Sequence, residues 1–151
     1  MNTFRVLQID HVELFVPNRH EAAQWYQRVL GLEILPEYEQ WAADTRGPLM
    51  ISSDDGNTKL ALFEGAPPGP GQASGFRLVA FRVGAAGFMR FLERLGDLQL
   101  KDHRDQAVTV DSVIDHAKAY SVYFSDPYGH RFEVTTYEYE ASRVALMSIR
   151  A

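Results

Sequence analysis

Two residues far apart in the sequence are of types that bind metal ions. His11 lies in the segment "IDHVELFV" and Glu133 lies in "RFEVTTY". Alternation of polar and apolar residues predicts a β-strand in each segment, with His11 on the polar face of the first strand. Glu133 stands between Phe132 and Val134, so its side chain points away from their apolar face. Imidazole and carboxylate groups are ligands of divalent ions, and both residues are candidate ligands.

The segment that leads to Glu133, "IDHAKAYSVYFSDPYGHRFE", combines a histidine with two strand-like runs and a tight turn. In "SDPYG" the aspartate accepts hydrogen bonds, the proline presets φ and the glycine closes the turn. His116 precedes the first run in a predicted loop, and Tyr123 lies within that run. The segment predicts a β-hairpin that carries polar groups.

The composition narrows the classes of function. The chain has 15 basic and 20 acidic residues, a formal charge of -5, and its basic residues are scattered among acidic ones, which argues against a nucleic-acid partner. It contains no cysteine, so any metal ion would be held by His, Asp or Glu. The sequence shows neither an N-terminal signal nor an apolar run of ~18 residues. We therefore expect a soluble, cytoplasmic protein with no membrane partner.

The chain reads as two copies of one pattern. In the first copy Asn18 is a predicted helix N-cap and Gly31 a predicted C-terminal glycine. The elements predicted there are a strand at 9–16, a helix after Asn18, and strands at 32–39, 49–53 and 59–64, the last two joined by the turn "DDGN". The second copy repeats this order with a strand at 78–83, a helix at 85–96 ending in a glycine, and strands at 98–103, 119–125 and 131–137.

The repeat predicts an α+β fold of two tandem βαβββ modules. One helix covers one face of a four-stranded sheet, so two modules are expected to pair their open faces and enclose a cleft. The predicted limits are 1–64 for the first module, 65–75 for a Pro- and Gly-rich linker, 76–137 for the second module and 138–151 for a C-terminal tail. Within this cleft His11 and Glu133 are candidates to meet.

The repeat also limits the number of ligands. It aligns His11 with Leu78, and Glu133 with Ala61, or with Leu60 if the turn is aligned without a gap. None of these three partners has a ligand atom, so only half of a fourfold His/Glu site is present.

These segments resemble the vicinal oxygen chelate superfamily, which includes glyoxalase I, extradiol ring-cleavage dioxygenases, fosfomycin-resistance enzymes and bleomycin-binding proteins. The resemblance runs from "IDHVELFV" and "WYQRVLGLE" to "YFSDPYGHRFEV", and "IDHAKAYSVYFSDPYGHRFE" is similar to the extradiol dioxygenase signature. It implies that His11 and Glu133 are metal ligands and that His116 and Tyr123 are catalytic residues that handle protons and oxygens of the substrate. Leu78 replaces the family's second histidine ligand, and Ala61 stands where a glyoxalase has a glutamate.

Two functions follow from the resemblance. The first is a divergent metal-dependent dioxygenase or lyase acting on a small oxygen-bearing or aromatic substrate, with a divalent ion (Fe, Mn, Zn or Ni) on His11, Glu133 and a third donor. That donor is His103, Glu13 or water. The second is metal-free binding of a planar compound, as in bleomycin-binding relatives, with aromatic residues in the cleft. The candidate aromatic residues are Tyr38, Trp41 and Tyr120. Since relatives pair modules within or between chains, a homodimer is expected.

Overall fold

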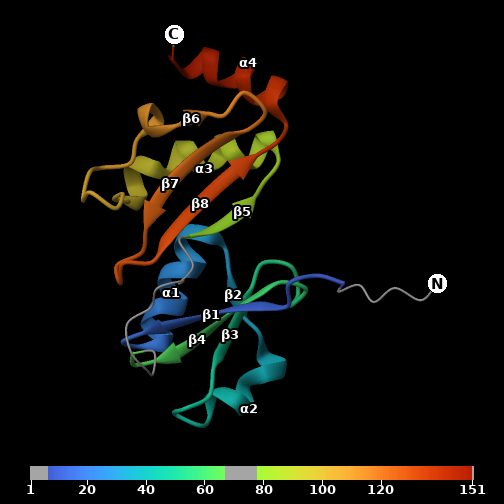
Figure 1. Ribbon diagram of the computed structural model, residues 1–151, viewed down its shortest axis with the longest axis vertical. Coiled ribbons are helices and arrows are strands. Elements are labelled where there is room, and N and C mark those ends of the chain that lie inside the picture. The colour runs from blue at the N-terminus through green and yellow to red at the C-terminus, as the bar shows by residue number, and fades with distance from the viewer. Residues whose placement is uncertain (1–6, 67–77, 151) are drawn as a thin grey trace, which may run out of the picture. The chain divides into compact units, whose positions relative to one another are not determined.

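The computed structural model describes residues 7–66 and 78–150 (Figure 1). The chain divides into two compact units, Met1–Gly71 and Gln72–Ala151, which we call the first and second modules and describe separately. The predicted linker, 65–75, lies for the most part outside the described residues, so the predicted module limits stay a prediction.

The first module has the predicted order of one strand, one helix and three strands. Its elements are β1 (His11–Val16), α1 (Arg19–Leu30), β2 (Glu33–Ile34), η1 (Pro36–Tyr38), α2 (Glu39–Ala42), β3 (Leu49–Ser52) and β4 (Lys59–Glu64). The four strands form a sheet in the order β1-β4-β3-β2, with β1 and β4 parallel and the other pairs antiparallel. Leu14, Val16 and Leu62 are buried with Tyr26 of α1, which packs on this face of the sheet.

The second module repeats this arrangement and adds a helix. Its elements are β5 (Val79–Arg82), α3 (Ala85–Leu98), η2 (Val110–Ser112), β6 (Ile114–Asp115), β7 (Tyr120–Ser125), β8 (Arg131–Thr136) and α4 (Tyr139–Arg150). The strand order, β5-β8-β7-β6, is equivalent to that of the first sheet. Figure 1 shows α3 behind β7 and β8, and the rings of Phe91 and Phe124 meet there with centroids 5.7 Å apart. The βαβββ repeat is thus confirmed within the described residues.

Local signals in the sequence account for most element ends. The Asn18 side chain accepts a hydrogen bond from the Glu21 amide, and Gly31 ends α1 with φ of 71°. The "DDGN" turn has positive φ at Asp55 (57°) and Gly56 (88°), as the two central residues of a type I′ turn do. In the turn after β7, Asp126 Oδ1 accepts the amides of both Tyr128 and His130.

Three predicted elements were wrong. The strand at 32–39 is only two residues long, because Pro36 lacks an amide hydrogen for a ladder and begins η1. No strand covers 98–103 in the described second module; Lys101 makes isolated bridges, and Ile114–Asp115 takes the fourth place in the sheet. Gly96 does not end α3, because the helix continues for two more residues to Leu98, whose side chain is buried.

The segment predicted as a C-terminal tail, 138–151, is helical over most of its length. Residues 139–150 form α4, which packs against α3 through the buried Leu146. No helix in the described ranges, 7–66 and 78–150, is long and apolar enough to span a membrane.

Candidate functional site

The second module brings three of the predicted site residues to one pocket. His116, Tyr123 and Glu133 line a cavity of about 540 Å³ on the sheet face opposite α3. His116 Nε2 lies 3.0 Å from the Tyr123 hydroxyl, within hydrogen-bonding distance, and the two rings meet edge to face. Tyr123 and Glu133 are cross-strand partners in the β7–β8 ladder, which places them side by side on this face.

A serine that the sequence did not single out fixes the carboxylate. The Ser121 hydroxyl donates a 2.6 Å hydrogen bond to Glu133 Oε1 and lies 2.9 Å from Thr135 Oγ1. Ser121 is fully buried. A short hydrogen bond to a charged acceptor is strong, so Ser121 restricts the direction of Glu133. The period of two along β7 places Ser121 and Tyr123 on the same face and was the available signal.

The rim of this pocket is rich in charged side chains. Arg131 Nη2 lies 3.4 Å from His103 Nδ1, and both residues line the cavity together with Arg104. Leu78, which the repeat aligns with His11, lines the same cavity as Glu133. Its side chain has no atom that could bind a metal ion. His103, one of the three proposed third donors, is therefore a neighbour of Arg131 in this pocket.

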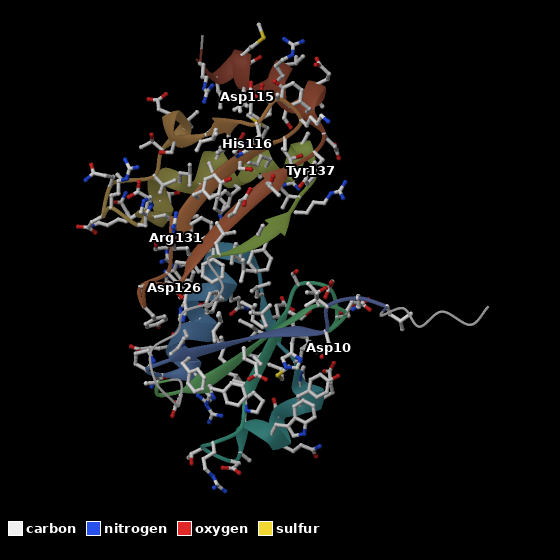
Figure 2. All side chains as sticks on the ribbon, viewed as in Figure 1. Asp10, Asp115, His116, Asp126, Arg131 and Tyr137 are labelled. Atoms are coloured by element: carbon white, nitrogen blue, oxygen red, sulfur yellow. The ribbon has the colours of Figure 1, made fainter. Side chains whose placement is uncertain are left out.

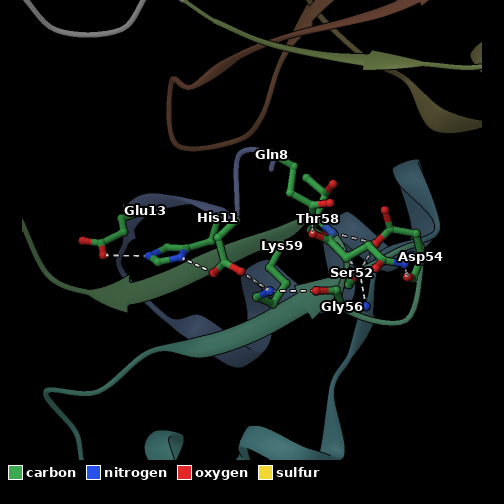
Figure 3. Close-up of polar contacts among 10 residues, drawn as sticks. Gln8, His11, Glu13, Ser52, Asp54, Gly56, Thr58 and Lys59 are labelled. Carbon is green, nitrogen blue, oxygen red and sulfur yellow. Dashed lines mark hydrogen bonds and ion pairs between the residues drawn. The ribbon is translucent and has the colours of Figure 1, made fainter. Parts of the chain in front are cut away.

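In the first module His11 lies between two carboxylates (Figure 3). Its Nδ1 is 2.8 Å from Asp10 Oδ2, and its Nε2 is 3.1 Å from Glu13 Oε2. The hydrogen bond with Asp10, followed by that with Glu13, raises the pKa of His11 above 6.5. Hydrogen bonds from His11 and then Lys59 lower the pKa of Asp10. Both ring nitrogens of His11 are thus engaged by carboxylates.

An aromatic pocket adjoins this network. It has a volume of about 370 Å³, and Tyr38, Trp41 and Phe63 lie in its wall together with His11 and Glu13. The rings of Tyr38 and Trp41 are stacked with centroids 4.6 Å apart, and Trp41 is 44% exposed. The predicted aromatic candidates Tyr38 and Trp41 therefore gather in the first module. Tyr120 instead stacks on Tyr139 in the second module.

The sheet registers show how the two modules correspond. In the first module Glu13 of β1 pairs with Ala61 of β4, and in the second Ala80 of β5 pairs with Glu133 of β8. The alignment of Glu133 with Ala61, rather than with the buried Leu60, therefore preserves the ladder. Each module carries one carboxylate at this pair of positions, on opposite strands.

The donors within each module do not by themselves make a metal centre. Among the residues that the structure describes, no three or more His, Asp or Glu side chains gather so that they could hold an ion. His11 and Glu133 belong to different modules, each described by itself. Their sharing of one ion stays a prediction.

The chain is similar to known proteins both in sequence family and in structure. The family model described as "Glyoxalase/Bleomycin resistance protein/Dioxygenase superfamily" matches residues 8–134. A glyoxalase/dioxygenase from Nostoc punctiforme is 22% identical, with 90% of this chain and 97% of that chain covered and a TM-score of 0.61. The fosfomycin resistance protein FosX from Listeria monocytogenes is 15% identical, with coverage of 91% and 99% and a TM-score of 0.63.

A further structure of the Listeria protein, a mutant in complex with Mn(II) and 1S,2S-dihydroxypropylphosphonic acid, is 14% identical. Its alignment covers 91% of this chain and 97% of that chain, with a TM-score of 0.64. No curated protein matches the sequence. At these identities the solved structures establish the fold alone, whereas the family model spans most of the sequence. The chain belongs to the Glyoxalase/Bleomycin resistance protein/Dioxygenase superfamily.

Proposed function

We propose that this chain is an enzyme that acts on a small oxygen-bearing substrate in the pocket of the second module. The observation that carries the proposal is the 3.0 Å contact between His116 Nε2 and the Tyr123 hydroxyl inside a cavity of about 540 Å³. An imidazole titrates near neutral pH, and a phenol can donate and accept, so the pair suits proton transfer.

In the proposed relay His116 donates a hydrogen bond to Tyr123, and Tyr123 donates one to the substrate. When His116 is protonated, its Nε2–H donates to the Tyr123 oxygen, which leaves the phenolic hydrogen free to point at the substrate. If Tyr123 gives that proton to an oxyanion developing on the substrate, the imidazolium replaces it, and the phenol is restored while His116 becomes neutral. In the reverse direction neutral His116 receives a proton through Tyr123.

The metal is a separate part of the proposal. His11 and Glu133 are the ligands that the family resemblance implies, and the Mn(II) in the Listeria complex supports a divalent ion in general. Such an ion, when bound, would polarise a substrate oxygen. Because no three donors gather among the residues of either module that the structure describes, the proton relay of His116 and Tyr123 is proposed without reference to the ion.

Turnover tests the proposal. Wild type, His116→Ala and Tyr123→Phe would be compared on small molecules with adjacent or strained oxygens, beginning with catechol and fosfomycin, with MnCl₂ and with EDTA. We expect each variant to lose about 10²–10⁴-fold in kcat, the usual contribution of general acid–base catalysis. His20→Ala, on the exposed face of α1, is the matched control. Full turnover by His116→Ala would refute the assignment.

A second candidate function is metal-free binding of a planar compound. The observation that favours it is the aromatic wall formed by Tyr38, Trp41 and Phe63 in the first module. Trp25→Phe leaves Trp41 as the fluorophore of a chain with two tryptophans. Bleomycin added to this variant should quench the emission in a saturable manner, and Tyr38→Ala should weaken the effect. Unchanged emission at high bleomycin would count against this function for that compound.

A homodimer is also proposed, on the resemblance alone. Sedimentation equilibrium should give the mass of two 17.1 kDa chains. The mass of a single chain would refute the homodimer and would not affect the proposed enzyme or binding function.

A further inference from the structure

The C-terminal helix α4 begins beyond the residues that the family model matches and contacts the loop that bears His116. The Tyr139 hydroxyl lies 2.9 Å from each carboxylate oxygen of Asp115 and donates to that carboxylate. At the other end of α4, Arg150 Nη2 donates to the Val110 carbonyl at 3.2 Å. The helix therefore holds the segment 110–115 at two points. Figure 2 shows Asp115 and His116 on the part of the module next to α4.

Asp115 in turn shapes the turn that contains His116. Its Oδ1 accepts the Ala117 amide at 2.7 Å, and the His116 amide donates to the Ala119 carbonyl at 2.9 Å. Ala117 has φ of 67°, a left-handed conformation that costs a non-glycine residue roughly 1–2 kcal/mol. The turn therefore persists because its neighbours hold it, and Asp115 is the side chain that reaches the strained residue.

In the hydrogen bonds that link Tyr139, Asp115 and Ala117, each group acts either as a donor or as an acceptor. Hydrogen bonds with Tyr120 and then Asp115 raise the pKa of Tyr139, so its hydroxyl keeps its proton at neutral pH. The Ala117 amide and then the Tyr139 hydroxyl lower the pKa of Asp115, which stays ionised. Tyr139 also stacks on the buried Tyr120 with ring centroids 4.8 Å apart and planes 4° from parallel, which fixes where the hydroxyl points.

We infer that Tyr139 is a positioning residue for His116, which it directs toward Tyr123 by holding Asp115 and the turn at Ala117. The catalytic meaning of this role rests on the proposed function. The positioning itself is a property of the protein without substrate and can be measured alone. Support of the His116 turn would then be the role of α4, which lies outside the region that the family model matches.

The test measures how strongly His116 senses Tyr123. In the full-length protein, Tyr123→Phe is expected to shift the ¹⁵N resonance of His116 Nε2, because it removes the hydroxyl 3.0 Å away. The same Tyr123→Phe substitution is then made in the Tyr139→Phe variant. Measured against Tyr139→Phe alone, it should shift the His116 Nε2 resonance by less than half as much. Tyr139→Phe keeps the ring stacked on Tyr120 and removes only the hydroxyl. The matched control is Tyr137→Phe, since Tyr137 is 58% exposed and its ring lies beneath the guanidinium of Arg82.

A second pair of variants separates positioning from general stability. Asp115→Ala removes the acceptor for both Tyr139 and Ala117, and it should reduce the Tyr123-dependent shift like Tyr139→Phe. Asp115→Asn keeps an acceptor oxygen and should restore most of the shift. If Tyr139→Phe and Asp115→Ala both leave the shift at its wild-type size, the inference is overturned, even if both variants melt earlier. If the shifts change as expected but no substrate is turned over, the positioning stands and the proposed function fails.

Discussion

Ser121 and Glu133 are joined by a 2.6 Å hydrogen bond between neighbouring strands, from the hydroxyl of β7 to Oε1 of β8. The serine is fully buried, and the carboxylate reaches the pocket that also holds His116 and Tyr123. The direction of the proposed metal ligand is therefore set by a residue that is itself inaccessible to substrate.

Replacing this serine should destabilise the module. Ser121→Ala removes the short donor to Glu133 Oε1 and leaves Thr135 Oγ1 with its hydrogen bond to the Tyr120 carbonyl. We expect the free energy of unfolding to fall by about 1.5–3 kcal/mol, the usual net contribution of a hydrogen bond to a charged group. Urea unfolding followed by circular dichroism measures this change in the free energy of unfolding. Ser125→Ala, at the half-buried end of the same strand, should cost much less. Equal effects of the two substitutions would contradict the role given to Ser121.

Restoring a histidine at position 78 should strengthen metal binding. Leu78 and Glu133 line the same pocket, so Leu78→His places an imidazole near the carboxylate. Calorimetric titration with Mn(II) should show an affinity higher by on the order of tenfold, or 1.4 kcal/mol. Leu78→Gln is the polar control, and adding Glu133→Ala should abolish the gain. Absence of Mn(II) uptake by both wild type and Leu78→His would remove the metal assignment.

The ion pairs of His11 should make stability depend on pH above 6.5. The folded pKa of His11 is raised above 6.5, so its contribution is fully present below pH 6.5 and is lost as the pH rises through the folded value. An NMR titration of the ring protons should give a pKa above 6.5. Asp10→Asn should lower that pKa more than Glu13→Gln does, since the Asp10 hydrogen bond is the larger cause. The reverse order would show that Glu13 dominates.

A buried arginine should be important for the aromatic pocket. Arg19 is 4% exposed, and its guanidinium donates to the carbonyls of Ala42, Asp44 and Gly47, which form the segment after Trp41. Arg19→Met removes the guanidinium donors from these carbonyls and should lower the free energy of unfolding by about 1–3 kcal/mol, the usual cost of leaving a buried hydrogen-bonding group unsatisfied. Chemical denaturation checks this value, with the 91%-exposed Arg46→Met as control. A loss below about 1 kcal/mol would contradict it.

The sequence predicted those parts of the fold that short-range signals determine. Asp55 and Gly56 predicted the first hairpin, and Asn18 and Gly31 predicted the limits of α1. The position of β6 could not be predicted, because Ile114 and Asp115 form a strand only through their pairing with β7. The helix α4 was missed, although the sequence holds local signals for it: Glu140 lies in its first turn, Arg150 lies in its last turn, and Glu140 pairs with Arg143 one turn further on.

For the site, the sequence identified side chains but not their supports. His116 and Tyr123 were recognised by their resemblance to a signature, and the structure brings them within 3.0 Å. Ser121 and Tyr139 were missed because a serine or tyrosine acquires such a role only through neighbours from other strands or helices. Hydrogen bonds between elements are properties of the folded chain and cannot be read from spacing.

The pairing of Glu13 with Ala61, and of Ala80 with Glu133, determines how a second carboxylate could be added to either module. Paired residues on neighbouring strands lie about 5 Å apart on the same face, where two carboxylates would repel each other. A glutamate at position 61 would be unfavourable while Glu13 remains. A design that adds a carboxylate at position 61 should therefore replace Glu13 at the same time.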